Sequence, residues 1–169
     1  NGLGDWFDVL SDTEKLAITQ DFIDRIYDTV RPHYTGVLIA HSYARYAAIG
    51  DFWTGISYAE YDLLNFALFP ECSIEQTQAY LDDQLEGYMT IVARDSLPYW
   101  INELTVYPEK YFEQACPETD FSVIEADLYQ TVFDAVDALP VKPSGMSVYF
   151  DNIRTDAAEQ VVVDYFNSH

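Results

Sequence analysis

Apolar side chains recur every three or four residues along much of the chain, and carboxylates fill many positions between them. The clearest example lies between Ser11 and Pro32, where Asp21, Asp24 and Asp28 stand opposite an apolar side. This period predicts an amphipathic helix that ends before the proline.

Three Ser-x-x-Glu or Ser-x-x-Gln sequences predict helix starts. In such a capping box the serine side chain accepts a hydrogen bond from the backbone N–H three residues on, and the Glu or Gln side chain reaches back. The three boxes begin at Ser11, Ser73 and Ser122. We expect the second and third helices to end near Pro98 and Pro140.

Other segments are apolar without so clear a polar side. Residues 36–49 are apolar nearly all round and predict a central helix. Residues 58–69 predict a further helix, and residues 99–115 predict one or two short ones. A last helix should begin at Thr155 or Asp156.

These elements indicate the fold class. Residues 146–151 are β-prone and predict a short strand or an extended strap. Everything else favours a mainly α fold, a single-domain bundle of roughly six helices over residues 1–169. No internal repeat, linker or domain boundary is visible in the sequence.

Charge sets the class of partner. The chain has 29 Asp plus Glu against 8 Lys plus Arg, a net charge of −21, yet it is 49% hydrophobic and 16% aromatic. An acidic chain this rich in aromatics should fold rather than stay disordered. Its surface should repel nucleic acid and anionic membranes and attract basic proteins. Adaptation to a salty environment would explain the same composition equally well.

The two cysteines indicate the compartment. Cys72 and Cys116 both stand at proline-marked breaks between predicted helices, so we expect them to form a disulfide, with two buried thiols as the alternative. The chain begins at Asn1, which fits either a mature exported protein or a trimmed sequence. No apolar run approaches the roughly 20 residues of a membrane span. We therefore expect a secreted or periplasmic protein.

No short catalytic or metal motif is present. The sequence lacks the Glu-x-x-His pair of a di-iron bundle, an EF-hand loop and a Gly-rich phosphate loop, so we expect no metal or cofactor. Residues 55–59 are similar to the Gly-x-Ser-x-Gly turn of hydrolases, but that turn needs a parallel sheet. We interpret Ser57 as a helix N-cap and name no catalytic residue.

Basic residues gather in one short region of this acidic chain: Arg31, His33, His41, Tyr43 and Arg45 form the candidate ligand or ion-pair set. His41 and Arg45 stand four apart on the predicted central helix and would share a face. A buried arginine needs a carboxylate partner, so an internal ion pair is the simpler interpretation. The alternative is a pocket for a small anion.

A second candidate set combines aromatic and acidic side chains, which together can hold Lys or Arg by cation–π and ion-pair contacts. Ordinary packing explains many such tyrosines equally well. The candidate interface residues are Tyr99, Trp100, Tyr107, Tyr111, Asp82, Asp83 and Glu86.

Three functions fit these observations. We expect an exported acidic helical protein that docks on a basic protein partner, as inhibitors, immunity proteins and adaptors do. The first alternative is a salt-adapted secreted or periplasmic protein that binds a small anionic ligand near His41 and Arg45. The second is an enzyme whose chemistry leaves no short motif.

Overall fold

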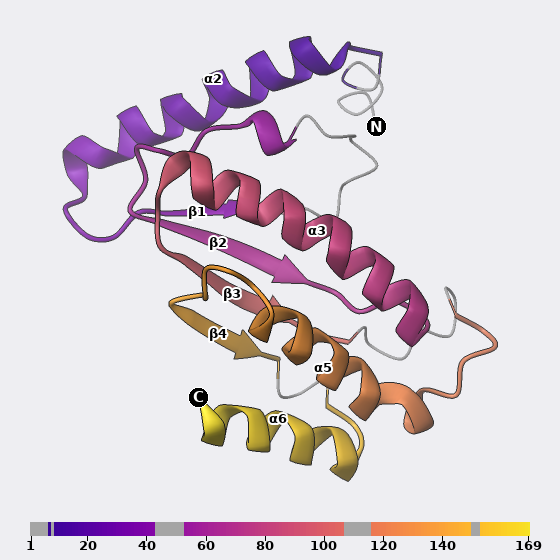
Figure 1. Cartoon of the computed structure of the whole chain (residues 1–169). Coiled ribbons are helices and arrows are strands. Elements are labelled where there is room, and N and C mark those ends of the chain that lie inside the picture. The colour runs from indigo at the N-terminus through magenta and orange to yellow at the C-terminus, as the bar shows by residue number, and fades with distance from the viewer. Residues whose placement is uncertain (1–6, 8, 43–52, 107–115, 150–152) are drawn as a thin grey trace. The chain divides into compact units, whose positions relative to one another are not determined.

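The computed structural model of the chain describes residues 7, 9–42, 53–106, 116–149 and 153–169 (Figure 1). Residues 41 and 42 are described by their backbone alone. In chain order the elements are α2 (Asp12–Val30), the 3-10 turn η1 (Arg31–His33), β1 (Ile39–Ser42), β2 (Leu63–Leu68), α3 (Ile74–Asp95), β3 (Tyr99–Leu104), α5 (Phe121–Asp137), β4 (Gly145–Val148) and α6 (Asp156–Ser168).

The predicted all-helical bundle is wrong, because the described chain is an α/β fold. Four strands form one sheet in the order β1-β2-β3-β4, with β1 parallel to β2 and β3 parallel to β4. Parallel strands need a long crossover connection. Here α3 connects β2 to β3, and α5 connects β3 to β4, so the alternation of strand and helix absent from our prediction is present.

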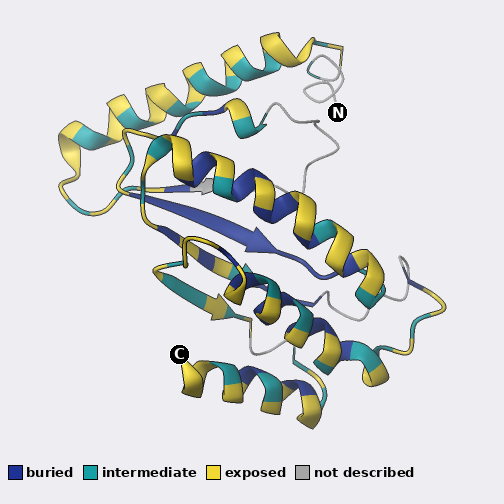
Figure 2. Cartoon of the chain, in the orientation of Figure 1, coloured by how far each residue is buried: buried dark blue, intermediate teal, exposed yellow. Residues whose placement is uncertain are grey.

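Buried parallel strands account for the error. All six residues of β2 are buried, as Figure 2 shows, so the strand is apolar apart from Asn65 and shows no alternation. Such a run cannot be told from a buried helix by its pattern. Residues 36–49, predicted as a helix, include strand β1, and residues 99–115, predicted as one or two helices, begin with strand β3. The short strand predicted near 146–151 is confirmed by β4.

The chain divides into two compact units, each with its own core. The first comprises Asn1–Phe66 with Gly87–Tyr99, and the second comprises Ala67–Glu86 with Trp100–His169. In the first unit Phe66 stacks on Tyr88 with ring centroids 4.0 Å apart. In the second, fully buried side chains of α5, among them Tyr129 and Phe133, form the inner side of the helix that packs on α6.

Two of the three predicted capping boxes are confirmed. Ser11 and Glu14 form a complete capping box at α2, and the Ser73 hydroxyl accepts the N–H of Gln76 at 3.2 Å. The third box is wrong, because Asp120 caps α5 in place of Ser122. As predicted, α6 begins after Thr155, whose side chain accepts the N–H of Ala158.

The Glu125 carboxylate, which was predicted to take part in the third capping box, is fully buried and links α5 to the start of α6. It accepts the backbone N–H of Arg154 at 3.1 Å, the N–H of Thr155 at 2.9 Å and the Thr155 hydroxyl at 2.9 Å. Thr155 is the N-cap of α6, where a carboxylate also meets the positive end of the helix dipole. Glu125 therefore fixes the start of α6 against α5.

The predicted disulfide is confirmed: Cys72 and Cys116 are bonded, with Cα atoms 5.5 Å apart. The Thr119 hydroxyl donates to the Cys72 carbonyl at 3.0 Å beside it. Within the part of the chain that the structure describes, no helix has the length and apolar character needed to cross a membrane.

Candidate functional site

A glutamine side chain on α2 holds the segment that precedes β2. The amide of Gln20 donates to the carbonyl of Ser57 at 2.9 Å and accepts the N–H of Ser57 at 2.8 Å, as a paired backbone would. The hydroxyl of Tyr61 adds a link farther along, because it donates to the carbonyl of Ile23 at 3.1 Å. These bonds fix residues 57–61 against α2.

The end of α3 holds the same segment from another side. Asp95 accepts the N–H of Tyr58 at 2.7 Å and the hydroxyl of Ser57 at 3.2 Å. The neighbouring Arg94 donates to Asp95 and to the carbonyl of Ile56. The Asp95 side chain is only 2% exposed, so these bonds are shielded from water.

The Asp95 carboxylate is stabilised in its ionised form. Burial by itself would raise its pKa, but the hydrogen bonds from Arg94 and from the Tyr58 N–H outweigh burial. Together with the charge of Arg94 they hold the pKa of Asp95 below its ordinary value. The segment 57–61 is therefore anchored to a charged, buried group.

This anchored segment and one side of α2 line an open cavity of about 410 Å³, which we call the acidic pocket. It contains carboxylates from both elements together with two tyrosines. Its lining residues are Gln20, Asp24, Asp28, Ser57, Tyr58, Ala59, Glu60 and Tyr61.

Among the described residues, no basic side chain compensates the carboxylates of the acidic pocket. Asp24 accepts a hydrogen bond from Gln20 at 2.7 Å, and none of the described lining residues is basic. Among the residues that the structure describes, Asp24, Asp28 and Glu60 form no ion pair. The pocket thus presents three negative charges.

The described basic residues of the first unit are engaged elsewhere. Each forms an ion pair with a carboxylate outside the acidic pocket: Lys15 with Asp12, Arg25 with Asp21, Arg31 with Asp62 and Arg94 with Asp95. The field at the pocket is therefore negative.

The tyrosine rings of the acidic pocket lie within this negative field. Burial, and then the charges of Asp24 and Glu60, raise the pKa of Tyr61. Its ring meets Tyr58 nearly edge-on, with centroids 6.4 Å apart, and Tyr27 at a tilt, with centroids 5.4 Å apart. Aromatic faces beside carboxylates attract an organic cation.

Metal binding fits the acidic pocket less well. Over the described ranges, no three His, Cys, Asp or Glu side chains come close enough to share a metal ion. The carboxylates of Asp24, Asp28 and Glu60 therefore line the cavity without meeting at one point.

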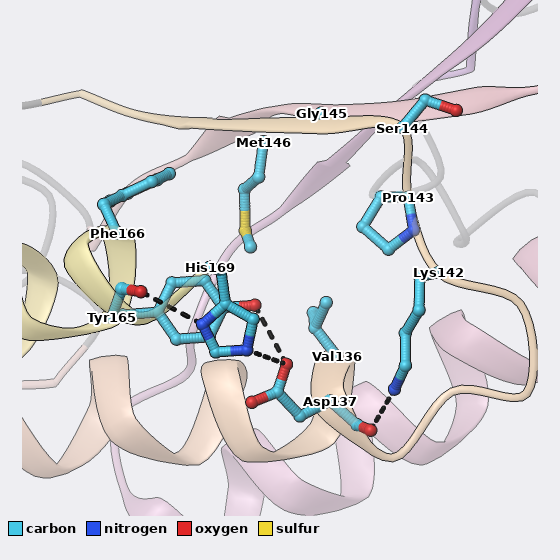
Figure 3. A pocket seen from close by; sticks show the side chains of 10 residues that line it. All are labelled: Val136, Asp137, Lys142, Pro143, Ser144, Gly145, Met146, Tyr165, Phe166 and His169. Atoms are coloured by element: carbon cyan, nitrogen blue, oxygen red, sulfur yellow. Dashed lines mark hydrogen bonds and ion pairs between the residues drawn. The ribbon is translucent and has the colours of Figure 1, made fainter.

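A second cavity, of about 460 Å³, lies in the second unit between the ends of α5 and α6 (Figure 3). Asp137 accepts the Tyr165 hydroxyl at 3.1 Å and faces Nε2 of His169 at 3.3 Å. Burial, and then the hydrogen bond to Asp137, raise the pKa of Tyr165 to about 12. Lys142 donates to the Asp137 carbonyl at the end of α5.

The polar groups of this second cavity bond to one another rather than converge on a ligand. Val136, Pro143, Met146 and Phe166 supply apolar walls. The side chain of Ser144 points away from His169 in Figure 3, whereas the Ser168 hydroxyl lies 3.1 Å from Nδ1 of His169. We interpret these hydrogen bonds as interactions that hold the ends of α5 and α6 together.

The structure separates the members of the predicted basic set. Arg31 pairs with Asp62, bonds to the Tyr27 hydroxyl at 3.2 Å and lies over the Tyr27 ring. His33 lies exposed in η1. Tyr43, Arg45 and the His41 side chain lie outside the described residues, so the predicted anion pocket stays a prediction.

The predicted interface residues occupy different environments. Tyr99 is buried and packs on Phe66, whereas Trp100, the next residue in β3, is 42% exposed. Three carboxylates lie exposed along α3: Asp82, Asp83 and Glu86. Tyr107 and Tyr111 lie outside the described residues.

Sequence reasoning missed the acidic pocket for two reasons. It interpreted Asp24 and Asp28 as the solvated side of a helix, and it placed residues 58–69 in a helix. Ser57 therefore seemed an N-cap, whereas its hydroxyl bonds to Asp95. The available signal was the pair of tyrosines that flank Glu60, three residues before the apolar run that begins at Leu63.

Comparisons of this chain with protein-family models, with curated proteins and with solved structures found no match. The function is therefore argued from the site itself.

Proposed function

We propose that this chain is an acidic binding protein whose acidic pocket receives a Lys or Arg side chain of a basic protein partner. The supporting observation is the convergence of Asp24, Asp28 and Glu60 with two tyrosines on one cavity whose described lining includes no basic residue. A net charge of −21 would steer a basic partner toward the whole surface. The pocket would then fix where one cation docks.

Magnitudes support a docking role rather than tight capture of a free amino acid. An exposed ion pair stabilises by about 0–1 kcal/mol, and an exposed cation–π contact by about 0.5–1 kcal/mol. A few such contacts give weak binding on their own. The affinity must come from additional surface that the partner covers.

We further propose that the chain acts in an oxidising compartment, as a secreted or periplasmic protein. The support is the Cys72–Cys116 disulfide, since such bonds persist where thiols are not kept reduced.

Charge-matched variants test the acidic pocket. One variant carries Asp24→Asn, Asp28→Asn and Glu60→Gln. Its control carries Asp82→Asn, Asp83→Asn and Glu86→Gln on the exposed side of α3, where the same residue types lose the same charge. Isothermal titration calorimetry with acetylated, amidated tetralysine measures the affinity of each at low salt, and thermal unfolding confirms that each folds.

The pocket variant should bind tetralysine at least about fivefold more weakly than the control variant, because only the pocket places carboxylates around a cavity. The wild-type affinity should fall steeply as salt rises. Equal losses of affinity in the two variants would mean that tetralysine responds to the overall negative charge and not to the pocket, and would overturn the proposal. A larger loss in the α3 control would move the site to that helix.

A further inference from the structure

Three aromatic rings of the second unit form a stack that ends at the second cavity. The rings of Phe133 and Tyr165 are nearly parallel, with centroids 4.0 Å apart and planes 6° apart. The imidazole of His169 stacks on Tyr165, with centroids 4.3 Å apart and planes 24° apart. Two rings this close to Tyr165 must take opposite faces of it. The stack therefore runs from the buried Phe133 through Tyr165 to His169, and the last two line the cavity.

His169 is the open end of this stack. Its side chain is 49% exposed, and among the described residues Tyr165 is the single ring that stacks on it. Figure 3 shows the imidazole in front of the Tyr165 ring, at one side of the cavity. A further planar ring can lie on the face turned away from Tyr165, because aromatic systems attract one another in offset stacks.

Hydrogen bonds hold the imidazole in place before any ligand arrives. Nδ1 of His169 lies 3.0 Å from the Tyr165 carbonyl, and Nε2 faces the Asp137 carboxylate at 3.3 Å. The Tyr165 hydroxyl donates to the same carboxylate at 3.1 Å. A ring that is already oriented loses little freedom when a ligand stacks on it.

Apolar side chains complete the cavity beside this ring. Val136, Pro143 and Met146 point toward the same space in Figure 3. A methionine sulfur makes favourable contacts with aromatic rings. The volume of about 460 Å³ lies within the range of about 300–1,000 Å³ that is typical of small-molecule sites. These walls suit a flat apolar body.

Lys142 indicates the charge of the ligand. Its ammonium donates to the Asp137 backbone carbonyl and forms no ion pair within the described ranges, whereas each described Lys or Arg of the first unit has a carboxylate partner. An ammonium has three donors, so Lys142 can also bind a carboxylate. The Asp137 carboxylate is turned to Tyr165 and His169 instead.

The ring face and the ammonium lie within reach of one small molecule. Asp137 links them, because its carboxylate faces His169 and its backbone carbonyl accepts from Lys142. The net charge of −21 opposes an anion at long range. At physiological salt that field is screened beyond about 8 Å, so the contact with Lys142 decides.

We infer that the second cavity binds a small planar aromatic carboxylate, whose ring stacks on His169 and whose carboxylate pairs with Lys142. This site is separate from the proposed function, because the acidic pocket is lined by residues of the first unit alone. The acidic pocket is tested with tetralysine, so either proposal can fail without the other.

Three probes of similar size test the inference. Naphthoate has the flat ring and the carboxylate, its fully hydrogenated analogue has the carboxylate on a puckered saturated body, and naphthamide has the flat ring without the charge. Each is titrated at about 0.15 M salt into the wild type, His169→Asn, His33→Asn and Lys142→Gln, and isothermal titration calorimetry gives the affinity. His33 is the matched control, because it is an exposed histidine of the first unit. Circular dichroism checks that each variant keeps the wild-type helix content.

Naphthoate should bind the wild type at least about threefold more tightly than its hydrogenated analogue, because only the flat ring can stack. His169→Asn should remove this preference, and His33→Asn should preserve it. Equal affinities of the two probes for the wild type, no measurable binding of naphthoate, or an unchanged preference in His169→Asn would overturn the inference.

The role of Lys142 has its own comparison. Naphthoate should bind the wild type about threefold more tightly than naphthamide, and Lys142→Gln should bring the two affinities together. A Lys142→Gln variant that keeps the preference for naphthoate, or a wild type that binds naphthamide as tightly, would overturn the assignment of a carboxylate ligand.

Discussion

Gln20 on α2 and Ser57 in the segment before β2 exchange two hydrogen bonds through one side-chain amide. The Gln20 amide supplies one donor and one acceptor, as a backbone peptide group does. The N–H and carbonyl of Ser57 are therefore both hydrogen-bonded, as they would be between neighbouring β-strands. Asp95 engages Ser57 and Tyr58 at the same time. The wall of the acidic pocket is therefore built before any partner arrives, which lowers the cost of ordering it on binding.

Replacing Gln20 by alanine should destabilise the first unit and loosen this wall. Two part-buried hydrogen bonds are lost, and at about 1 kcal/mol each the free energy of unfolding should fall by about 2 kcal/mol. Gln160→Ala is the control, because the Gln160 amide donates to Asp164 on the exposed side of α6. Urea unfolding measures both. Equal losses would contradict a special role for Gln20.

Asp95 should make stability depend on acid pH. Its folded pKa lies below the ordinary value of 3.8, so the folded chain binds this proton less readily than the unfolded chain. The stability that it contributes is complete above that value and is lost as the pH falls toward the lower, folded pKa. Asp95→Asn should be less stable than the wild type at pH 7, and the gap should narrow below about pH 4.

Urea unfolding of Asp95→Asn at several pH values checks this dependence, with Asp82→Asn on the exposed side of the same helix as the control. A gap between wild type and Asp95→Asn that stays constant from pH 7 to about pH 3 would contradict an ionised, stabilised Asp95.

Glu125 should be the costliest single carboxylate to remove from the second unit. Glu125→Ala leaves the N–H groups of Arg154 and Thr155 without their acceptor, and a loss of about 3 kcal/mol is expected. Glu159→Ala, in the exposed first turn of α6, should cost less than about 1 kcal/mol. Thermal unfolding followed by circular dichroism ranks the two, and the reverse order would contradict the structure.

Loss of the disulfide should destabilise the chain through its unfolded state. A sequence separation of 44 between Cys72 and Cys116 corresponds to about 4 kcal/mol of loop-closure entropy. Cys72→Ser with Cys116→Ser should therefore unfold at markedly lower urea, and reduced wild type should match it. A double variant as stable as the oxidised wild type would contradict this estimate.

Local signals in the sequence predicted what local interactions decide. The capping box at Ser11 and the start of α6 at Thr155 depend on residues within four positions, and both are confirmed. The disulfide followed from two cysteines at chain breaks. The third capping box was wrong because the Glu125 carboxylate accepts the backbone N–H of Arg154, 29 residues away, instead of reaching back to Ser122. No local sequence pattern indicates such a distant hydrogen bond.

The sheet could not be predicted from the sequence, because its central strand β2 is buried on both faces. The run from Leu63 to Leu68 holds a single polar residue, Asn65, which does not reveal a period of two, and β1 has only four residues. In β3 buried Tyr99 and Ile101 alternate with exposed Trp100. The sequence analysis instead assigned residues 99–115 to one or two short helices around Pro108. The acidic pocket depends on the non-local Gln20–Ser57 pairing, so it could not be read from spacing along the chain.

The most direct test of the central claim is the position at which a cation binds. Two-dimensional ¹H–¹⁵N NMR of the labelled wild type, titrated with acetylated, amidated tetralysine, reports each backbone amide. We predict that the largest shifts fall on Gln20, Asp24, Ser57, Glu60 and Tyr61, and that added salt reverses them. Shifts that spread evenly over the acidic surface, or that centre on residues 82–86 of α3, would contradict the account.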